Sequence, residues 1–239
     1  MGVCEVCFRH CHLTERQIGD CGARTYRDGR VRPVFYGRIS SLALDPIEKK
    51  PLYHFFPGSM ILSVGSLGCN LHCPFCQNHE IAQIGEYGTF SIQTDDVRPE
   101  MLVEIAQFYR KKGNIGIAFT YNEPLVGYEF VRDTAKLAGE KDLKRVLVTN
   151  GTATLPVLEE IAPHIDAMNI DLKGFTDRYY KEVLKGVYGG KSGKEIPLHI
   201  SRFFPRYRMT DRGPTDVKKV YELVEEAKKN LTYVYPGNC

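Results

Sequence analysis

The loop Gly68-Cys69-Asn70-Leu71-His72-Cys73-Pro74-Phe75-Cys76 follows directly on the strand-like run Ile61-Leu62-Ser63-Val64. Its three cysteines have C-x3-C-x2-C spacing. Ordinary electron-transfer clusters and cysteine-closed zinc sites usually take four protein ligands. A four-iron cubane held by only three thiolates keeps one iron open to another ligand, which suits catalysis better than electron storage.

Two other interpretations of this loop stay open on the residues alone. With His72 or His79 as a fourth ligand, the cysteines suit a structural zinc site. The pair Cys73-Pro74-Phe75-Cys76 also matches the C-x2-C spacing of glutaredoxin-like dithiols. The redox interpretation leaves Cys69 and the regular sequence downstream unexplained.

From Ile61 onwards, β-branched runs alternate with amphipathic segments. The expected strands are 61–66, 115–119, 146–149, 167–172, 198–203 and 231–235, and the expected helices are 99–112, 125–141, 155–161, 177–184 and 214–229. Pro99, Asp177 and Pro214 are the candidate helix-start residues. Alternation with apolar strands predicts a parallel sheet. At about 30 residues per βα unit, about six units fit, so we expect an α/β fold with a partial (β/α)6-type barrel.

The chain divides into three parts by composition. Residues 1–38 form a Cys-rich segment, 39–60 a Pro-rich connector, and 61–239 the barrel. Within the first part, Cys4, Cys7, Cys11 and Cys21 offer four thiolates, which suit a closed zinc site or an auxiliary iron–sulfur cluster. A short segment poor in apolar residues needs such a staple to fold, which favours a structural metal.

Charge and cysteine usage narrow the class of protein. A formal charge of +3 on 239 residues does not imply nucleic-acid binding. The sequence has no apolar run of membrane-spanning length and no signal pattern. Apart from Cys239, the eight cysteines form two tight groups, which indicates metal binding in a reducing cytoplasm.

Polar residues stand at the ends of successive expected strands. They are Thr120-Tyr121-Asn122-Glu123-Pro124, Thr149-Asn150-Gly151 and Asp171-Leu172-Lys173-Gly174, and His199 lies within the fifth strand. Reactive groups of βα barrels gather at the carboxyl ends of the strands, where the cysteine loop also falls. We therefore expect a lined cavity there, with Phe75 shielding a cluster and stacking on an adenine.

In this order, the segments resemble the radical S-adenosylmethionine (SAM) superfamily, and within it enzymes similar to pyruvate formate-lyase activating enzyme. The nearer resemblance is to the subgroup called the AmmeMemoRadiSam-system radical SAM protein. It is carried by the four-cysteine N-terminal stretch, the block Ser40–Leu52 and the block His199–Pro205. The likeness covers nearly the whole chain.

The resemblance implies a role for each matching residue. Cys69, Cys73 and Cys76 would ligate a [4Fe-4S] cluster, whose open iron the amino and carboxylate groups of SAM chelate. The remaining assignments are Asn122 and Glu123 for the methionyl ammonium, Asn150 and Asp171 for the ribose and sulfonium region, Lys173 for the methionyl carboxylate, and His199 for the adenosyl group or the substrate.

The activity that this implies is reductive cleavage of SAM to a 5′-deoxyadenosyl radical, which removes a hydrogen from a substrate. An external donor such as flavodoxin or ferredoxin would supply the electron. Arg202, Arg206 and Arg208 follow the fifth strand, so we expect a small anionic substrate. Two alternatives stay open: an activase that installs a glycyl radical on a partner enzyme, and a metal-stapled RNA-binding or interaction module.

The chain departs from the pattern of this family in two places. Only residues 175–197 separate the fourth and fifth expected strands, where relatives usually carry another strand–helix unit. The sequence also stops at Cys239, where relatives continue with further cysteines. Both departures put a complete barrel wall and a full set of substrate contacts in doubt.

Overall fold

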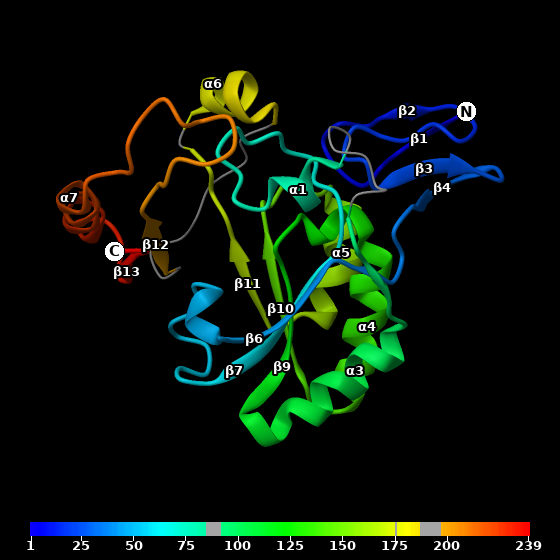
Figure 1. Cartoon of the computed structure of the whole chain (residues 1–239), viewed down its shortest axis with the longest axis horizontal. Coiled ribbons are helices and arrows are strands. Elements are labelled where there is room, and N and C mark those ends of the chain that lie inside the picture. The colour runs from blue at the N-terminus through cyan, green and yellow to red at the C-terminus, as the bar shows by residue number, and fades with distance from the viewer. Residues whose placement is uncertain (85–91, 175, 187–196) are drawn as a thin grey trace. The chain divides into compact units, whose positions relative to one another are not determined.

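The computed structural model describes residues 1–84, 92–174, 176–186 and 197–239. The chain forms two compact units (Figure 1). The first comprises Met1–His72 and Asn78–Tyr188, and the second comprises Cys73–Gln77 and Gly189–Cys239. The boundaries at residues 38 and 60 that composition suggests remain a prediction.

A five-stranded sheet forms the centre of the first unit. Its strand order is β11-β10-β9-β7-β6, with β6 antiparallel to β7 and the other neighbours parallel. The strands are β6 (Ser41–Pro46), β7 (Met60–Gly65), β9 (Asn114–Phe119), β10 (Lys144–Thr149) and β11 (Ala167–Ile170). The predicted parallel sheet is therefore confirmed, and it is consistent with a partial barrel. The connector adds β6, a strand that its Pro-rich sequence does not suggest.

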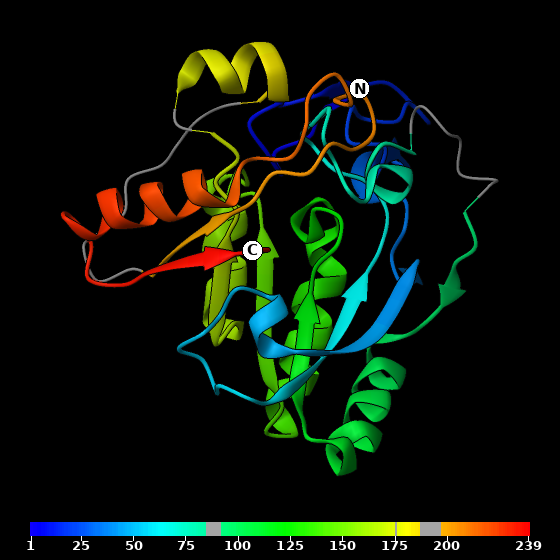
Figure 2. The ribbon, with the colours of Figure 1, turned by 60° about the vertical axis from the view of Figure 1, so that its left-hand side comes forward.

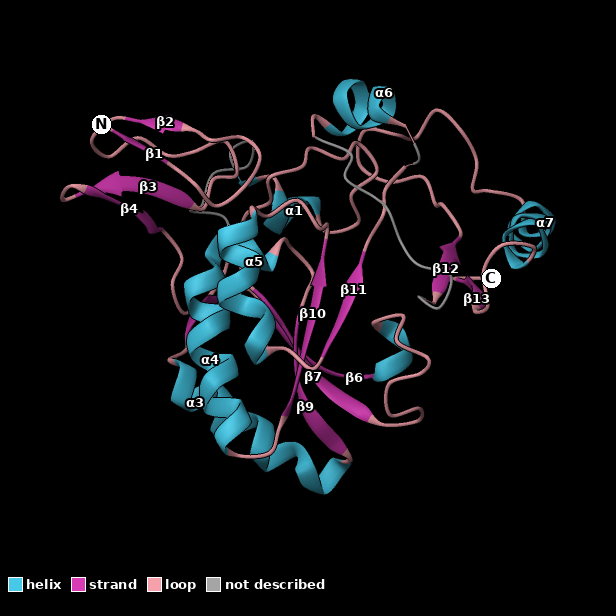
Figure 3. Cartoon of the chain, turned by 180° about the vertical axis from the view of Figure 1, so that it is seen from behind, coloured by secondary structure: helices cyan, strands magenta, loops and turns pink. Residues whose placement is uncertain are grey.

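Three helices cover one face of this sheet: α3 (Pro99–Phe108), α4 (Tyr128–Glu140) and α5 (Leu155–Ile161) (Figure 3). Strand side chains such as Leu62, Ile117 and Leu147 belong to the same buried cluster as the apolar stripes of these helices. The predicted bounds of α5 are confirmed, and 3-10 turns extend the helical region after α3 and before α4. Burial of this face ties the strands into one rigid platform.

The opposite face of the sheet packs against the β6–β7 connection. Ile61 and Ala118 of the sheet form a second buried cluster with Ile47, and Leu52 and Phe55 pack against that cluster. The connection, which includes a 3-10 turn at Ile47–Lys49, therefore covers part of the face that the helices leave open.

An ionic network anchors this connection to the sheet. Asp45, at 8% exposure, accepts a hydrogen bond from the Lys50 Nζ at 2.8 Å and another from the Tyr121 hydroxyl at 2.8 Å. The Lys50 ammonium is itself 3% exposed and lies 4.9 Å from the centre of the Tyr121 ring. Tyr121 immediately follows Thr120 at the carboxyl end of β9, so the network joins the β6–β7 connection to the polar edge of the sheet.

The Cys-rich N-terminal segment folds as small two-stranded pieces within the first unit. They are β1 (Gly2–Val3) with β2 (His12–Leu13), and β3 (Arg24–Arg27) with β4 (Arg30–Pro33). At the end of the segment, β5 (Arg38–Ile39) pairs with β8 (Asp95–Asp96), which lies further along the chain. Val6 and Leu13 join the same buried cluster as α3 and α4, so this segment packs on the main core.

The second unit contains a separate parallel pair, β12 (Leu198–Ser201) and β13 (Val234–Gly237), connected through α7 (Val217–Lys228). Figure 2 shows α7 in orange-red beside this pair. The prediction that Pro214 starts the helix is wrong. Asp216 is the N-cap and accepts a hydrogen bond from the Lys218 backbone N–H at 2.9 Å, since a side-chain carboxylate can satisfy the first turn there.

Short elements complete the described chain: α1 (His79–Ala82), and α6 (Asp177–Tyr179), which continues into a π turn at Tyr180–Leu184. Thr176 caps α6 by accepting the Tyr179 backbone N–H, so Asp177 is its first residue as predicted. Part of the short interval after β11 (residues 175 and 187–196) lies outside the described residues. Among the helices described, none has the length and apolar character needed to cross a membrane.

Candidate functional site

The polar edge of the main sheet brings together residues from three strand ends and the first half of the cysteine loop. The loop begins after β7, Glu123 follows β9, and Asn150 follows β10. Because these strands are parallel, their carboxyl ends lie at one edge of the sheet. This is where the sequence predicts a lined site.

Glu123 is a buried brace at this edge. Its carboxylate accepts hydrogen bonds from the Leu125 N–H at 3.0 Å, the Thr149 hydroxyl at 2.8 Å and the Asn150 N–H at 2.7 Å. Burial raises the pKa of Glu123, although these donors act in the opposite direction. The side chain is 3% exposed. Its oxygens therefore fix the ends of β9 and β10 relative to each other.

Asn150 connects the strand end that Glu123 fixes to the cysteine loop. Its amide Nδ2 donates to the Asn70 Oδ1 at 2.8 Å and to the Cys69 Sγ at 3.8 Å. The Thr152 hydroxyl accepts from the Asn70 Nδ2 at 2.9 Å and donates to the Asn150 Oδ1. The Leu71 N–H is a second donor to the Cys69 Sγ, at 3.4 Å. N–H donors aimed at sulfur stabilise a thiolate, so Cys69 suits a cluster ligand.

Glu123→Gln should weaken this arrangement. The new amide group would place an N–H donor against one of the three existing donors, which leaves a buried donor unsatisfied. We expect a loss of about 1–3 kcal/mol of unfolding free energy, and activity lower by about 10- to 100-fold. Urea denaturation and 5′-deoxyadenosine release measure the two effects. The control is Glu104→Gln at an exposed position of α3. Equal unfolding free energies and equal product release for the two variants would contradict the prediction.

Asn122 holds the start of the loop. Its Oδ1 accepts the Ser66 N–H at 3.1 Å, and its Nδ2 donates to the Gly68 carbonyl at 3.0 Å. The Gly68 carbonyl also accepts the Glu123 N–H at 3.3 Å. In the structure Asn122 and Glu123 thus position the loop backbone, and their assignment to a methionyl ammonium remains a prediction.

Asp171 and Lys173, after β11, form an ion pair with each other. The Lys173 backbone N–H donates to the Tyr180 hydroxyl at 2.9 Å. The Lys173 ammonium also acts on the pKa of Glu123, so it lies within electrostatic range of that carboxylate. The structure therefore brings the two residues to the same polar edge, while their roles stay predictions.

The remaining predicted residues belong to the second unit. Within it, the Phe75 ring contacts the Phe203 ring edge to face at 6.2 Å, and the Pro74 carbonyl accepts the Arg208 N–H at 2.9 Å. His199 stacks on Tyr235 at 5.2 Å between ring centroids, across the β12–β13 pair. Cys73 and Cys76 are joined by a backbone hydrogen bond of 3.2 Å.

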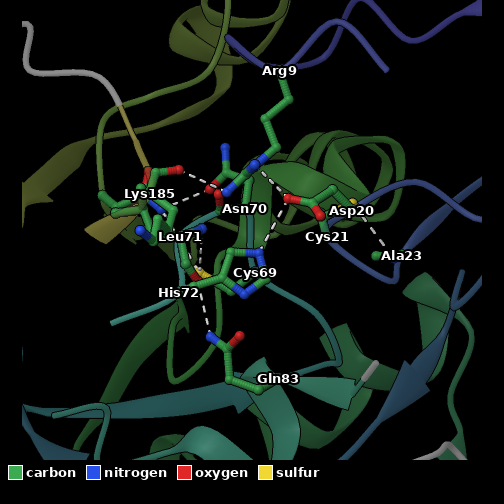
Figure 4. Close-up of polar contacts among 11 residues, drawn as sticks. Arg9, Asp20, Cys21, Ala23, Cys69, Asn70, Leu71, His72, Gln83 and Lys185 are labelled. Atoms are coloured by element: carbon green, nitrogen blue, oxygen red, sulfur yellow. Dashed lines mark hydrogen bonds and ion pairs between the residues drawn. The ribbon is translucent and has the colours of Figure 1, made fainter. Parts of the chain in front are cut away.

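The structure adds residues that the sequence does not single out (Figure 4). The Arg9 Nε donates to the Asn70 carbonyl at 2.8 Å, and its guanidinium pairs with Asp20 at 2.5 Å. Asp20 in turn contacts the His72 ring at 3.1 Å, and the Gln83 amide donates to the Leu71 carbonyl at 2.8 Å. Arg9 lies 61 positions from Asn70 and Asp20 lies 52 from His72, so no local pattern predicts these two contacts.

Gly68 marks the closest approach between the N-terminal segment and the loop. Its φ is +91°, and a Cβ there would lie 2.6 Å from the Cys21 carbonyl oxygen and 2.8 Å from the Ala23 Cβ. Only glycine therefore fits this conformation and this contact.

Gly68→Ala tests this contact against a matched control, Gly58→Ala. Gly58 has a similar φ of +78°, and a Cβ there would meet nothing within 4 Å. Both variants carry the backbone strain, so their difference isolates the clash. We expect Gly68→Ala to lower the unfolding free energy by about 1–3 kcal/mol more than Gly58→Ala. Equal midpoints in urea would show that the N-terminal segment can move away from the new Cβ without a loss of unfolding free energy.

Cys4, Cys7, Cys11 and Cys21 line a single cavity of the first unit, and the structure contains no disulfide among them. Burial raises the pKa of Cys4 and raises that of Cys21 to about 12. Among the described residues, no three His, Cys, Asp or Glu side chains are already drawn together in the geometry of metal ligands. The structure thus places these four thiols around one cavity, while their role as metal ligands remains a prediction.

The fold and site show a parallel α/β sheet with a cysteine loop and polar strand ends at its carboxyl edge, which is consistent with a partial radical SAM barrel. The chain matches the Radical SAM superfamily over residues 63–235 and belongs to it. This membership implies a [4Fe-4S] cluster and SAM as cofactors.

Individual relatives agree with this assignment. The uncharacterized protein MJ0808 of Methanocaldococcus jannaschii is 36% identical over an alignment that covers 98% of this chain and 80% of the relative. That alignment is 281 positions long, so MJ0808 carries segments without a counterpart in the 239 residues here.

More distant similarity extends to two enzymes of stated activity. The pyruvate formate-lyase-activating enzyme of Clostridium pasteurianum is 29% identical over 48% of this chain and 46% of its own length. The cysteine-type anaerobic sulfatase-maturating enzyme of Clostridium perfringens is 27% identical over 41% of this chain and 26% of its own length. In both cases the chain spans less than half of the relative.

Proposed function

We propose that this radical SAM enzyme cleaves SAM reductively and removes a hydrogen atom from a small anionic substrate. Within the superfamily we assign it to the subgroup called the AmmeMemoRadiSam-system radical SAM protein, from the blocks at Ser40–Leu52 and His199–Pro205. The observation that carries the proposal is the Cys69 thiol, which receives two N–H donors at the carboxyl edge of a parallel sheet.

In this proposal Cys69, Cys73 and Cys76 hold the [4Fe-4S] cluster. When reduced, the bound cluster supplies the electron that splits SAM into methionine and a 5′-deoxyadenosyl radical, and that radical takes a hydrogen atom from the substrate. The role of the polypeptide is to bind the cofactors and to hold the cysteine loop in a fixed orientation. Asn150 fixes Asn70 and the Cys69 sulfur, and Glu123 fixes Asn150.

Other side chains would bind the organic part of the cofactor. The backbone around Asn122 offers carbonyl groups to an ammonium, and the Lys173 ammonium is suited to a carboxylate. In the second unit, Phe75 offers an aromatic face to an adenine, and His199 offers a ring nitrogen to the adenosyl group or the substrate. We further propose that β12 and β13 belong to the wall of a (β/α)6-type barrel.

The loop after β12 supports an anionic substrate. It carries the exposed Arg206 and Arg208, and the Arg202 Nε donates to the Thr215 carbonyl at 2.7 Å, which fixes the start of this loop. Clustered guanidinium groups bind carboxylates and phosphates well because their donors match two acceptor oxygens at once. The electron would come from a flavodoxin or a ferredoxin.

The activity is tested by anaerobic reconstitution with iron and sulfide, followed by dithionite and SAM. We expect 5′-deoxyadenosine and methionine to be released in equal amounts, measured by liquid chromatography. A protein that assembles the cluster and binds SAM but releases neither product would overturn the proposal.

A second candidate, activation of a partner enzyme by installation of a glycyl radical, is favoured by the similarity to the pyruvate formate-lyase-activating enzyme. The two candidate functions can be distinguished with extracts of the source cells that are fractionated by size and by anion exchange. If the low-mass anionic fraction increases 5′-deoxyadenosine release, the first candidate is supported. If only the protein fraction does so, the activase is supported.

A further inference from the structure

The four N-terminal cysteines line one cavity from three parts of the segment. Cys4 and Cys11 come from the β1–β2 hairpin and its turn, where the Cys4 N–H donates to the Cys11 carbonyl at 2.9 Å. Cys7 precedes a turn closed by the His10 N–H, and Cys21 precedes β3. The side chains of all four cysteines line the same cavity.

A backbone N–H group is aimed at one of these sulfurs as at Cys69. The Ala23 N–H donates to the Cys21 Sγ at 3.5 Å. This donor stands two residues after the cysteine, which is also the relation of Leu71 to Cys69. A donor in this position stabilises negative charge on sulfur, so the conformation of this segment favours deprotonated cysteine side chains.

A buried cation points to the same conclusion. Arg24 lines the cavity with the cysteines and is 4% exposed. Its Nη1 pairs with Glu129 at 2.6 Å, but its buried Nε has no hydrogen-bond partner. A buried guanidinium with an unsatisfied N–H next to four neutral thiols is costly, whereas a metal bound by four thiolates carries a negative charge that would offset it.

The size of the cavity favours one ion over a cluster. The cavity volume is about 10 Å³. That is about the minimum for one water molecule, and a four-iron cubane of eight atoms is much larger. No three potential ligands among the described residues are already drawn together in metal-ligand geometry, so the sulfurs must move inwards to reach tetrahedral Zn–S distances of about 2.3 Å.

We propose that Cys4, Cys7, Cys11 and Cys21 bind a single tetrahedral divalent ion of the zinc type. Four metal–sulfur bonds form as the four thiols release their protons to solvent, and no electron is transferred. The ion is a structural cross-link, here called the staple, for a segment that has few buried apolar residues of its own.

This staple also supports the cysteine loop of the radical SAM site. The Cys21 carbonyl oxygen lies against Gly68, Asp20 beside it contacts His72, and Arg9 between Cys7 and Cys11 donates to the Asn70 carbonyl (Figure 4). Fixing the four sulfurs thus fixes the wall against which residues 68–72 are built.

The test uses the full chain with Cys69, Cys73 and Cys76 replaced by alanine, so that no cluster of the radical SAM site contributes metal. Purified without added metal, this variant should contain about one zinc ion per chain and no iron or labile sulfide. After removal of zinc, a titration with Co²⁺ should end at about one equivalent, with the absorption of a tetrahedral thiolate site.

A second variant in the same background, with Cys7 and Cys21 also replaced by serine, should contain less than about a tenth of an equivalent of zinc. Replacement of the exposed Cys239 instead is the matched control and should leave the zinc content unchanged. Residual iron with sulfide would overturn the proposal in favour of a second cluster. Absence of any Co²⁺ site in the folded chain would overturn it altogether. Neither outcome depends on cleavage of SAM.

Discussion

Cys73→Ala is expected to reduce 5′-deoxyadenosine release to the background of cluster-free protein. With three protein thiolates, the fourth iron of the cubane stays open to the amino and carboxylate groups of SAM. Removal of one thiolate leaves a second iron without a protein ligand, so the cluster loses its fixed orientation or does not assemble. The measurement is product release under dithionite after anaerobic reconstitution, with iron and sulfide determined on the same sample.

Two further variants make this result interpretable. Cys69→Ala should cause the same loss, because the predicted site uses all three thiolates equally. Cys239→Ala removes an exposed cysteine outside both groups and should retain full activity. Substantial product release by Cys73→Ala, with the cluster present, would show that the assignment of the three ligands is wrong.

Lys50→Met is expected to lower the unfolding free energy by about 3–5 kcal/mol. Lys50 is 3% exposed and donates to Asp45 at 2.8 Å. Methionine keeps much of the volume but removes the charge, which leaves the buried Asp45 carboxylate without its buried cationic partner. Burial lowers the pKa of Lys50, and Asp45 partly offsets that effect, so the two charges depend on each other.

The neighbouring Lys49 is a matched control, because its ammonium also contacts Asp45, at 3.3 Å, but its side chain is 66% exposed. An exposed ion pair contributes at most about 1 kcal/mol, so Lys49→Met should be nearly neutral. Urea denaturation followed by circular dichroism measures both variants. Similar midpoints for the two would contradict the importance of burial at this pair.

The same network predicts how stability depends on acid. Burial by itself would raise the pKa of Asp45, but hydrogen bonds from Lys50 and Tyr121 outweigh it and hold that pKa well below its usual range. A lowered folded pKa contributes stability that is present above the unfolded value of about 3.9 and is lost as the pH falls below it. Asp45→Asn should therefore lose less stability than the wild type between about pH 5 and pH 3. Equal losses would contradict this role.

The local pattern of apolar and polar residues was sufficient to predict most of the strands of the main sheet and its helices. β7, β9 and β10 are apolar, β-branched runs buried on both faces, and α5 has the bounds that its periodicity predicts. β6 could not be predicted in this way, because Asp45 and Pro46 are unusual in strands. Its pairing with β7 and the ion pair to Lys50 keep it extended. The last strand lies further along the chain than predicted, at Val234–Gly237.

The cysteines and strand-end residues of the site could be located from sequence, because their chemistry is specific and their position follows from the order of strands. The side chains that hold them could not. Arg9 contacts Asn70 across 61 positions, and Tyr121 contacts Asp45 across 76. Such contacts exist only once the chain has folded. The hydrogen bonds that Glu123 accepts from Thr149 and Asn150 likewise show a bracing role that its place in the motif did not suggest.

The antiparallel direction of β6 limits where this sheet can grow. A parallel strand joined by a helix extends a sheet in regular steps, and β6 ends that progression beside β7. At the opposite margin β11 pairs, within the described residues, with β10 alone, and its Ile170 is 63% exposed. Within the described sheet, the parallel edge that an additional strand–helix unit would extend, in a longer homologue or in an engineered chain, is therefore that of β11.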